Sequence, residues 1–356
     1  KHKTQVFFAT SNDHICTRIE HVNHVCSVSD TIVKYLGLSS ELVTSIAIGH
    51  DLGHAPFGHA GEKILEEIVK RDIQEEFWHE KNGLMMVDYI ETLPDINGNE
   101  NNLSLTYAVR DGIICHCGEI DEESLKPRTE VIDLYAINSI HDVSPFTWEA
   151  CVVKVADKIA YLGRDIEDAL KLNIIDEKQI DEFKKVIENR YNYEFPELTN
   201  SRLLHNSIIN LCQNSNPDDG IRFSIEYFNL IKEIKSFNYN NIYLHARLDT
   251  FKDYAKLILE SIYKHLSDLY EGRNTIKNLK RKNELHPTPL LAALFEDWLI
   301  KYTDIDLIQK QEKKYINDMV FKIDDKNDFV KAVIIFISGM SDLFAINVFN
   351  ELISFR

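Results

Sequence analysis

Apolar residues recur at helical spacing through most of the chain, and this periodicity predicts an all-α fold. The first predicted helix covers residues 17–36 and ends at Gly37, a residue type that favours the left-handed C-terminal cap of a helix. The second covers about residues 41–52, after a serine that can cap its first turn. A long third helix covers residues 144–172 and has a proline in its first turn.

Two histidines, His21 and His50, fall on the apolar faces of the first two helices. Viewed singly, a histidine on such a face is more often a hydrogen-bonded core residue than a ligand. Seven of the chain's 14 histidines, however, lie between residues 14 and 79, and the burial of so many imidazoles has to be compensated. His54 lies one turn beyond the adjacent pair His50 and Asp51, and a short turn makes the helix of His21 their antiparallel neighbour. These residues therefore indicate a site for a divalent metal ion.

A further ligand is expected from the long third helix. Its segment 156–169 carries Asp157, Tyr161 and Asp165 at helical spacing on one stripe. By periodicity alone this stripe is typical of the solvent-exposed face of an amphipathic helix. The spacing therefore offers candidates for the further metal ligand but does not distinguish a ligand from an ordinary exposed residue.

Composition and charge narrow the classes of function. The formal net charge of −17 disfavours broad nucleic-acid binding, so single-stranded DNA as a partner is not supported by charge. A small phosphorylated ligand fits if cations are concentrated locally, and a bound metal ion is one such cation. Six scattered cysteines indicate a reducing compartment, and we expect a cytoplasmic protein. No apolar run approaches the ~20 residues of a membrane span, so no membrane association is expected.

The length of 356 residues is enough for one large domain or two closely packed ones. The candidate chemistry lies in the first half, whereas the second half has the pattern of packed helices. We expect a catalytic core in residues 1–180 and a helical portion in residues 181–356 that completes the pocket and makes oligomer contacts. The two portions are expected to form one continuous globular unit.

Three segments resemble the HD-domain superfamily and, more closely, its deoxyguanosine-triphosphate triphosphohydrolase-like family. They are Thr17-Arg-Ile-Glu-His21, HDLGHAPFGHAGE at 50–62 and ADKIAYLGRDIEDA at 156–169. The segments at 237–248 and 337–345 also resemble parts of this family, although Leu343 stands where a basic residue is usual. The resemblance thus touches nearly the whole chain. It implies an all-α HD-domain core elaborated by further C-terminal helices.

The resemblance also implies roles for individual residues, which fall into three groups. The metal ligands would be His21, His50, Asp51 and Asp157. The catalytic residues around the phosphates would be His54, His59, Glu62 and His79. The residues that bind the triphosphate, the nucleoside or the sugar 3′-hydroxyl would be Gln5, Arg18, Lys158, Tyr161 and Asp165.

The activity that the resemblance implies is hydrolysis of a deoxynucleoside triphosphate, dGTP or others, at the α-phosphate. The products would be the deoxynucleoside and intact triphosphate, and the cofactor would be Mn²⁺, Mg²⁺ or Fe²⁺. His59 or His79 would protonate the leaving 5′-oxygen, with Glu62 holding its partner. A homo-oligomer and a nucleotide effector are also implied.

Two alternatives stay open. The first is another HD phosphohydrolase activity, either a nucleotide phosphatase or a phosphodiesterase, and the second is a non-catalytic nucleotide-sensing scaffold. The stretch Cys115-His-Cys117 could in principle bind metal, but it lacks a second ligand pair. We expect two small core side chains that flank a polar one.

Overall fold

The computed structural model describes residues 3–7, 15–117, 123–139, 143–191 and 199–354. Its chain divides into two compact units, each built from segments that are not contiguous in sequence. Unit 1 comprises Lys1–Thr4, Leu52–Leu105 and Lys252–Arg356, and unit 2 comprises Gln5–Asp51 and Thr106–Phe251. The boundaries of these units differ from those of the expected portions 1–180 and 181–356. The expected division into a catalytic core and a helical portion that completes the pocket stays a prediction.

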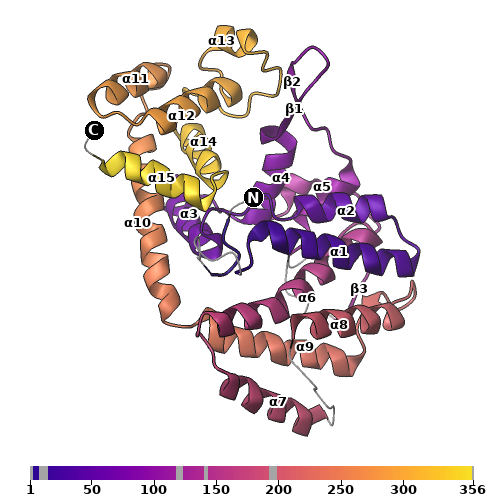
Figure 1. Cartoon of the computed structure of the whole chain (residues 1–356). Helices are drawn as coiled ribbons and strands as arrows, with labels where there is room; N and C mark the ends of the chain where they lie inside the picture. Colours follow the sequence, from indigo (N-terminus) through magenta and orange to yellow (C-terminus); the bar gives the residue numbers. More distant parts are fainter. Residues whose placement is uncertain (1–2, 8–14, 118–122, 140–142, 192–198, 355–356) are drawn as a thin grey trace. The chain divides into compact units, whose positions relative to one another are not determined.

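Helices dominate both units, and the prediction of an all-α fold is confirmed (Figure 1). Within the described residues, β-structure is confined to two short antiparallel pairs and isolated bridges. The pairs are β1 with β2, in which Thr92 lies opposite Asn102, and β3 with β4, in which Ser124 lies opposite Arg222.

Unit 2 carries the first two helices and the long helix of the sequence analysis. The first helix begins with a capping box between Thr17 and Glu20 and ends at Gly37, whose φ is 75°. The helices and strands of unit 2 are α1 (Arg18–Leu36), α2 (Ser40–Gly49), α5 (Tyr107–Ile114), β3 (Ser124–Leu125), the 3₁₀ turn η2 (Leu134–Ala136), α6 (Trp148–Lys171), α7 (Glu177–Tyr191), α8 (Asn200–Asn214), β4 (Ile221–Arg222), α9 (Ile225–Asn238) and the π-helical turn η4 (Tyr239–Tyr243).

Two boundaries in unit 2 differ from the expected ones. The second helix ends at Gly49, three residues before the expected end, so that His50 is its C-terminal cap and Asp51 lies in the following turn. The long helix begins at Trp148, because Thr147 caps it by accepting a hydrogen bond from the Ala150 backbone N–H.

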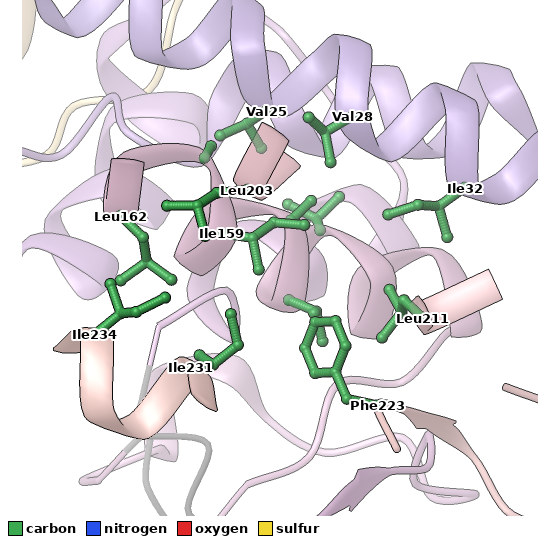
Figure 2. Close-up of a cluster of buried hydrophobic side chains, with 14 of the residues drawn as sticks. Val25, Val28, Ile32, Ile159, Leu162, Leu203, Leu211, Phe223, Ile231 and Ile234 are labelled. Carbon is green, nitrogen blue, oxygen red and sulfur yellow. The ribbon is translucent and has the colours of Figure 1, made fainter. Parts of the chain in front are cut away.

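The core of unit 2 is a continuous cluster of buried aliphatic side chains around α6. Figure 2 shows Val25, Val28 and Ile32 of α1 together with Ile159 and Leu162 of α6 in this cluster. Side chains from α8, α9 and the residue after β4 complete it. The three helices α1, α2 and α6 pack on one another, and this packing fixes where their histidines and aspartates point.

Unit 1 contains the remaining elements and a smaller cluster around Met86, Ile90, Tyr302, Phe321 and Ala332. Its elements are α3 (Gly58–Ile73), α4 (His79–Met85), the π-helical turn η1 (Met86–Ile90), β1 (Thr92–Pro94), β2 (Glu100–Asn102), α11 (Thr275–Leu285), α12 (Pro289–Tyr302), α13 (Leu307–Glu312), α14 (Lys326–Ser338) and α15 (Asp342–Ile353). The helix α10 (Arg247–Ser267) crosses the division at residues 251 and 252.

Among the described residues, no single helix has both the length and the apolar character of a membrane span. The helices α14 and α15 reach that length and composition only as a pair, and the chain bends by 117° at the break between them.

Candidate metal centre and catalytic residues

Two histidines and two aspartates of unit 2 converge at the meeting point of α1, α2 and α6. The Nε2 atom of His21 lies 2.8 Å from Oδ1 of Asp157, and that of His50 lies 3.6 Å from the same oxygen. Asp51 completes the group, because its carboxylate oxygens lie 3.5 Å from Nε2 of His50 and 3.9 Å from Nε2 of His21. The structure thus brings together the four residues that the resemblance implies as metal ligands.

The charges at this centre favour a cation. Burial alone would lower the pKa of His50, but Asp51 and Asp157 outweigh it and raise this pKa to about 9. Burial would likewise raise the pKa of Asp157, but the hydrogen bond from His21 and the charges of His21 and His50 hold it well below its usual value. The two carboxylates therefore stabilise positive charge beside the imidazole nitrogens.

The residues present fit a divalent metal ion. The Nδ1 atom of His50 donates a hydrogen bond to the Ala47 carbonyl at 2.6 Å, which leaves Nε2 as the atom that faces the carboxylates. This Nε2 is buried and has no hydrogen-bond partner among the described residues. Imidazole nitrogens and carboxylate oxygens together are the ligands that Zn²⁺, Fe²⁺ and Mn²⁺ accept.

Arg18 makes a buried ion pair with Asp51, with 2.7 Å between Nη1 and Oδ2. The resemblance implies that Arg18 contacts phosphate. In the structure its guanidinium balances one of the carboxylates, so the two residues are coupled: neutralising Asp51 would leave a buried cation behind.

Close packing of α2 against α5 brings one further histidine to this centre. A Cβ atom on Gly112 would lie 2.6–2.7 Å from three side-chain atoms of Ile46, so the helices approach more closely than a side chain would allow. His116, which follows α5, is buried, and its ring centroid lies 5.0 Å from that of His50. Its Nε2 atom lies 3.1 Å from Sγ of Cys117. Sequence reasoning expected a polar core residue here and missed its contact with His50.

The helix α6 also presents Asp165, for which a contact with the sugar is implied. Its carboxylate accepts a hydrogen bond of 2.5 Å from the hydroxyl of Tyr243. Burial raises the pKa of Asp165 to about 7, against the opposing effect of this hydrogen bond. Tyr243 was not among the predicted site residues, although the segment 237–248 that contains it was noted as resembling the family.

A small cavity of about 40 Å³, which we call the cationic cavity, lies against α6. Lys158, Lys232, Lys235 and Arg222 line it, together with Glu123 and apolar side chains that include Phe228. Sequence reasoning proposed Lys158 and missed the other three cations, because they come from β4 and from α9, whose lysine spacing is that of an ordinary exposed helix face. The remaining substrate candidates are Gln5, which is buried with no hydrogen-bond partner for its Oε1 atom among the described residues, and Tyr161, which is half-buried.

Unit 1 holds a second cluster, made of two imidazoles and one carboxylate. One Glu62 oxygen contacts Nδ1 of His54, and the other lies 3.2 Å from Nδ1 of His79. The two rings stack with centroids 3.8 Å apart, and the ring of His59 lies 6.0 Å from that of His54. Although burial opposes it, the two histidines hold the pKa of Glu62 well below its usual value. The cluster therefore pairs a carboxylate with imidazoles that can carry a proton.

Two glycines in unit 1 allow this cluster to form. A Cβ atom on Gly53 would lie 1.9 Å from the carbonyl oxygen of His79 and 2.2 Å from the Gly83 nitrogen. A Cβ atom on Gly61 would lie 1.8 Å from the carbonyl oxygen of Pro56. Any other residue at either position would push the loop that carries His54 away from α4 or from α3.

Comparison with known proteins shows which group of proteins this chain resembles. The HD domain family matches residues 18–162. A deoxyguanosinetriphosphate triphosphohydrolase-like protein of Rickettsia bellii is 30% identical over 366 residues, which cover 99% of this chain and 87% of the relative. Another, from Desulfatibacillum aliphaticivorans, is 32% identical over 82% of this chain and 75% of the relative. A third, from Clostridium tetani, is 29% identical over 74% of this chain and 67% of the relative.

Proposed function

Because this chain belongs to the deoxyguanosinetriphosphate triphosphohydrolase-like family of HD-domain proteins, we propose that it hydrolyses deoxynucleoside triphosphates at the α-phosphate. The products would be the deoxynucleoside and intact triphosphate. The observation that carries the proposal is the convergence of His21, His50, Asp51 and Asp157 in unit 2. HD-domain hydrolases need a metal ion, and this donor set fits one.

In this proposal the two histidines and two aspartates hold one divalent ion, Mn²⁺, Mg²⁺ or Fe²⁺. When bound, such an ion supplies a water of lowered pKa and positive charge for phosphate oxygens. The protein's own part begins with the carboxylate of Asp157. Its Oδ1 atom lies 2.8 Å from Nε2 of His21, so these two ligand atoms already face the point where they would hold the ion.

The cations of unit 2 provide for the negative charge of a triphosphate. Lys158, Lys232, Lys235 and Arg222, four cations against the one carboxylate of Glu123, line one cavity of a protein whose net charge is −17. Concentrated ammonium and guanidinium groups attract phosphate oxygens and offset charge that grows in the transition state. This arrangement supports a polyanionic substrate more than a neutral one.

Two residues of α6 would select the sugar. Asp165 as a carboxylate accepts a hydrogen bond from a 3′-hydroxyl, and the hydroxyl of Tyr243 holds that carboxylate in place. Tyr161 would exclude a 2′-hydroxyl by packing against the ribose. Deoxynucleotides would then be preferred over ribonucleotides.

The leaving 5′-oxygen of the sugar is a poor leaving group unless it receives a proton. We assign that donation to the imidazole–carboxylate cluster of unit 1, with His59 or His79 as the acid. Glu62 contacts His54 and His79 and would keep an imidazolium charged. These roles rest on the family resemblance and on the chemistry of the cluster.

A product assay tests the proposal directly. The purified protein is incubated with each dNTP and with Mn²⁺, Mg²⁺ or Fe²⁺, and the products are separated by ion-exchange chromatography. The proposal expects deoxynucleoside and triphosphate in equal amounts. Pyrophosphate or orthophosphate as the primary product would contradict it and would favour another phosphohydrolase activity. Mass photometry with and without added nucleotides would test the implied homo-oligomer and effector.

A further inference from the structure

The carboxylate of Asp342 in unit 1 joins three parts of the chain that are far apart in sequence. It is buried at the first turn of α15. Its Oδ1 atom accepts a hydrogen bond of 2.8 Å from the backbone N–H of Phe57. Its Oδ2 atom accepts one of 2.8 Å from the backbone N–H of Thr4 and another from the Thr4 hydroxyl. A buried carboxylate that accepts several hydrogen bonds is stable only while those donors stay in place.

The residue that donates to Oδ1 has an unusual backbone conformation. Phe57 precedes the first turn of α3 with φ of 65°, in the left-handed region that a bulky residue rarely adopts, and Gly58 follows with φ of 58°. The Phe57 side chain is buried, which anchors the ring, and Asp342 fixes the N–H of the same residue. Such a strained turn persists only when its surroundings hold it.

The same loop is held at its other end by neighbours of Asp342. The Nζ atom of Lys3 donates to the carbonyl of His54 at 2.5 Å and to the carbonyl of Ser338 at 2.7 Å. The amide of Asn82 donates to the carbonyl of Gly53 at 2.6 Å and lies 3.0 Å from the Ser338 hydroxyl. The last residue of α14 and the first residue of α15 therefore hold both ends of residues 53–57, directly or through Lys3 and Asn82.

We propose that Asp342 is a positioning residue that sets the loop carrying His54 and the start of α3, and thereby the contact between His54 and Glu62. Glu62 lies on the first turns of α3, whose direction depends on the conformation of Phe57. Without the carboxylate, the Phe57 N–H has no acceptor and the turn relaxes toward ordinary backbone angles. Glu62 then moves relative to the ring of His54, and the proton-donating cluster loses its geometry. The effect of Asp342 on catalysis rests on the proposed function, whereas its positioning of the loop at residues 53–57 does not.

The test compares Asp342→Ala and Asp342→Asn with the matched controls Asp325→Ala and Asp325→Asn in the full chain. Asp325 caps the neighbouring helix α14 through the backbone N–H groups of Asn327 and Asp328, so its loss also removes a helix-capping carboxylate. The Asn variant keeps the size of Asp342 but has one acceptor oxygen for donors on two sides, Phe57 and Thr4, so it gives a partial loss if the Ala variant does not fold. Thr4→Val removes a single donor and gives a milder change.

The first readout is amide hydrogen exchange of peptides that cover residues 53–60, measured without substrate. Exchange in this loop is expected to rise about tenfold or more in the Asp342 variants and to stay unchanged in Asp325→Asn. Equal protection of the loop in all variants would overturn the proposal. Hydrogen exchange tests the positioning role of Asp342 even if the wild-type protein hydrolyses no dNTP. That second result would contradict the proposed function and leave the positioning role untouched.

The second readout separates positioning from general stability. At a temperature where all variants are folded, kcat of Asp342→Ala is expected to fall about a hundredfold, the loss that a small misplacement of catalytic groups produces, and kcat of Asp342→Asn is expected to fall less. KM for dNTP and the affinity for Mn²⁺ should change little, because the cationic cavity and the metal centre lie in unit 2. If Asp325→Ala lowers kcat to the same extent as Asp342→Ala, Asp342 acts only through stability.

Discussion

The Nε2 atom of His21 and Oδ1 of Asp157 lie 2.8 Å apart although 136 residues separate them in sequence. The contact exists because α1 and α6 pack along their apolar faces, so that the register of that packing decides which polar residues meet. It turns two helix-face residues into a candidate pair of metal ligands.

Asp157→Asn keeps the size of this side chain and removes its charge. We expect the affinity for Mn²⁺, measured by isothermal titration calorimetry, to fall at least about a hundredfold, because a neutral amide replaces one of the two anionic ligands. Turnover should fall in parallel. Chelation of the wild-type protein with EDTA should abolish activity, and added Mn²⁺ should restore it.

The matched control for this substitution is Asp181→Asn on α7, where the carboxylate is exposed. It should leave both metal affinity and turnover unchanged. An Asp157→Asn protein that binds Mn²⁺ as tightly as the wild type would remove Asp157 from the metal site.

Lys232→Ala and Lys235→Ala test the cationic cavity. Each is expected to raise KM for dNTP, and the inhibition constant of inorganic triphosphate, roughly tenfold, equivalent to about 1.4 kcal/mol of binding free energy. Higher salt should weaken inhibition by triphosphate in the wild type more than in either variant.

The control for the cavity is Lys178→Ala, since the Lys178 side chain is 82% exposed on α7. If all three lysine variants raise KM for dNTP and the inhibition constant of triphosphate equally, the cause is the change in net charge and the cavity does not bind phosphate.

Asp165 should make recognition of the sugar depend on pH. Its raised pKa of about 7 means that the buried group holds a proton below that pH and is a carboxylate above it. Because the carboxylate is the form that accepts a hydrogen bond from the 3′-hydroxyl, KM for dNTP should fall as pH rises through about 7. A 2′,3′-dideoxynucleotide lacks that hydroxyl and corrects for titration of the phosphates.

Tyr243→Phe removes the hydrogen bond that lowers this pKa, so the midpoint of the pH profile should move upward. Asp165→Asn should make the difference between the two nucleotides independent of pH, because an amide still accepts a hydrogen bond but does not titrate. A profile that is the same for dNTP and dideoxynucleotide in the wild type would exclude Asp165 from sugar recognition.

Gly112→Ala tests the close approach of α2 and α5. Alanine would gain about 1 kcal/mol of helix propensity. The new methyl, however, would meet three atoms of the buried Ile46 side chain at 2.6–2.7 Å, and overpacking of this kind costs about 1–3 kcal/mol. We expect net destabilisation in urea unfolding and weaker Mn²⁺ binding, because His116 shifts against His50.

Gly37→Ala provides the comparison for Gly112→Ala. Gly37 has open space around it but a φ of 75°, so alanine there should lower stability through backbone strain alone. Its metal affinity should equal that of the wild type. Weaker metal binding in both glycine variants would mean that affinity merely follows global stability.

The sequence predicted the helical class and the candidate ligands, and it did so through two different kinds of information. Periodicity placed His21 and His50 on buried faces, since those faces are set by local spacing. The same spacing described Asp157 as part of an ordinary exposed stripe, and only resemblance to a family distinguished it. Which faces meet is decided by long-range packing, which spacing along one helix does not contain.

Other parts of the site show the same limit. Lys232 and Lys235 lie on a helix with an ordinary amphipathic pattern. They become candidate phosphate-binding residues only because the fold places them on the same cavity as Lys158. Tyr243 lies 78 residues from Asp165, and Asp342 lies 285 residues from Phe57. The end of the second helix was also misplaced from the sequence. The helix α2 ends at Gly49, so Asp51 lies in the following turn, where it makes its ion pair with Arg18.

The hydrogen bond from Phe57 to Asp342 has a consequence for synthesis on the ribosome. The loop at residues 53–57 leaves the exit tunnel long before residue 342 has been translated, so during most of elongation its strained turn has no acceptor. A nascent chain could pack α1 and α2 early and still lack an ordered His54–Glu62 pair. Hydrolysis that depends on this pair would begin only after translation has passed the last described helix.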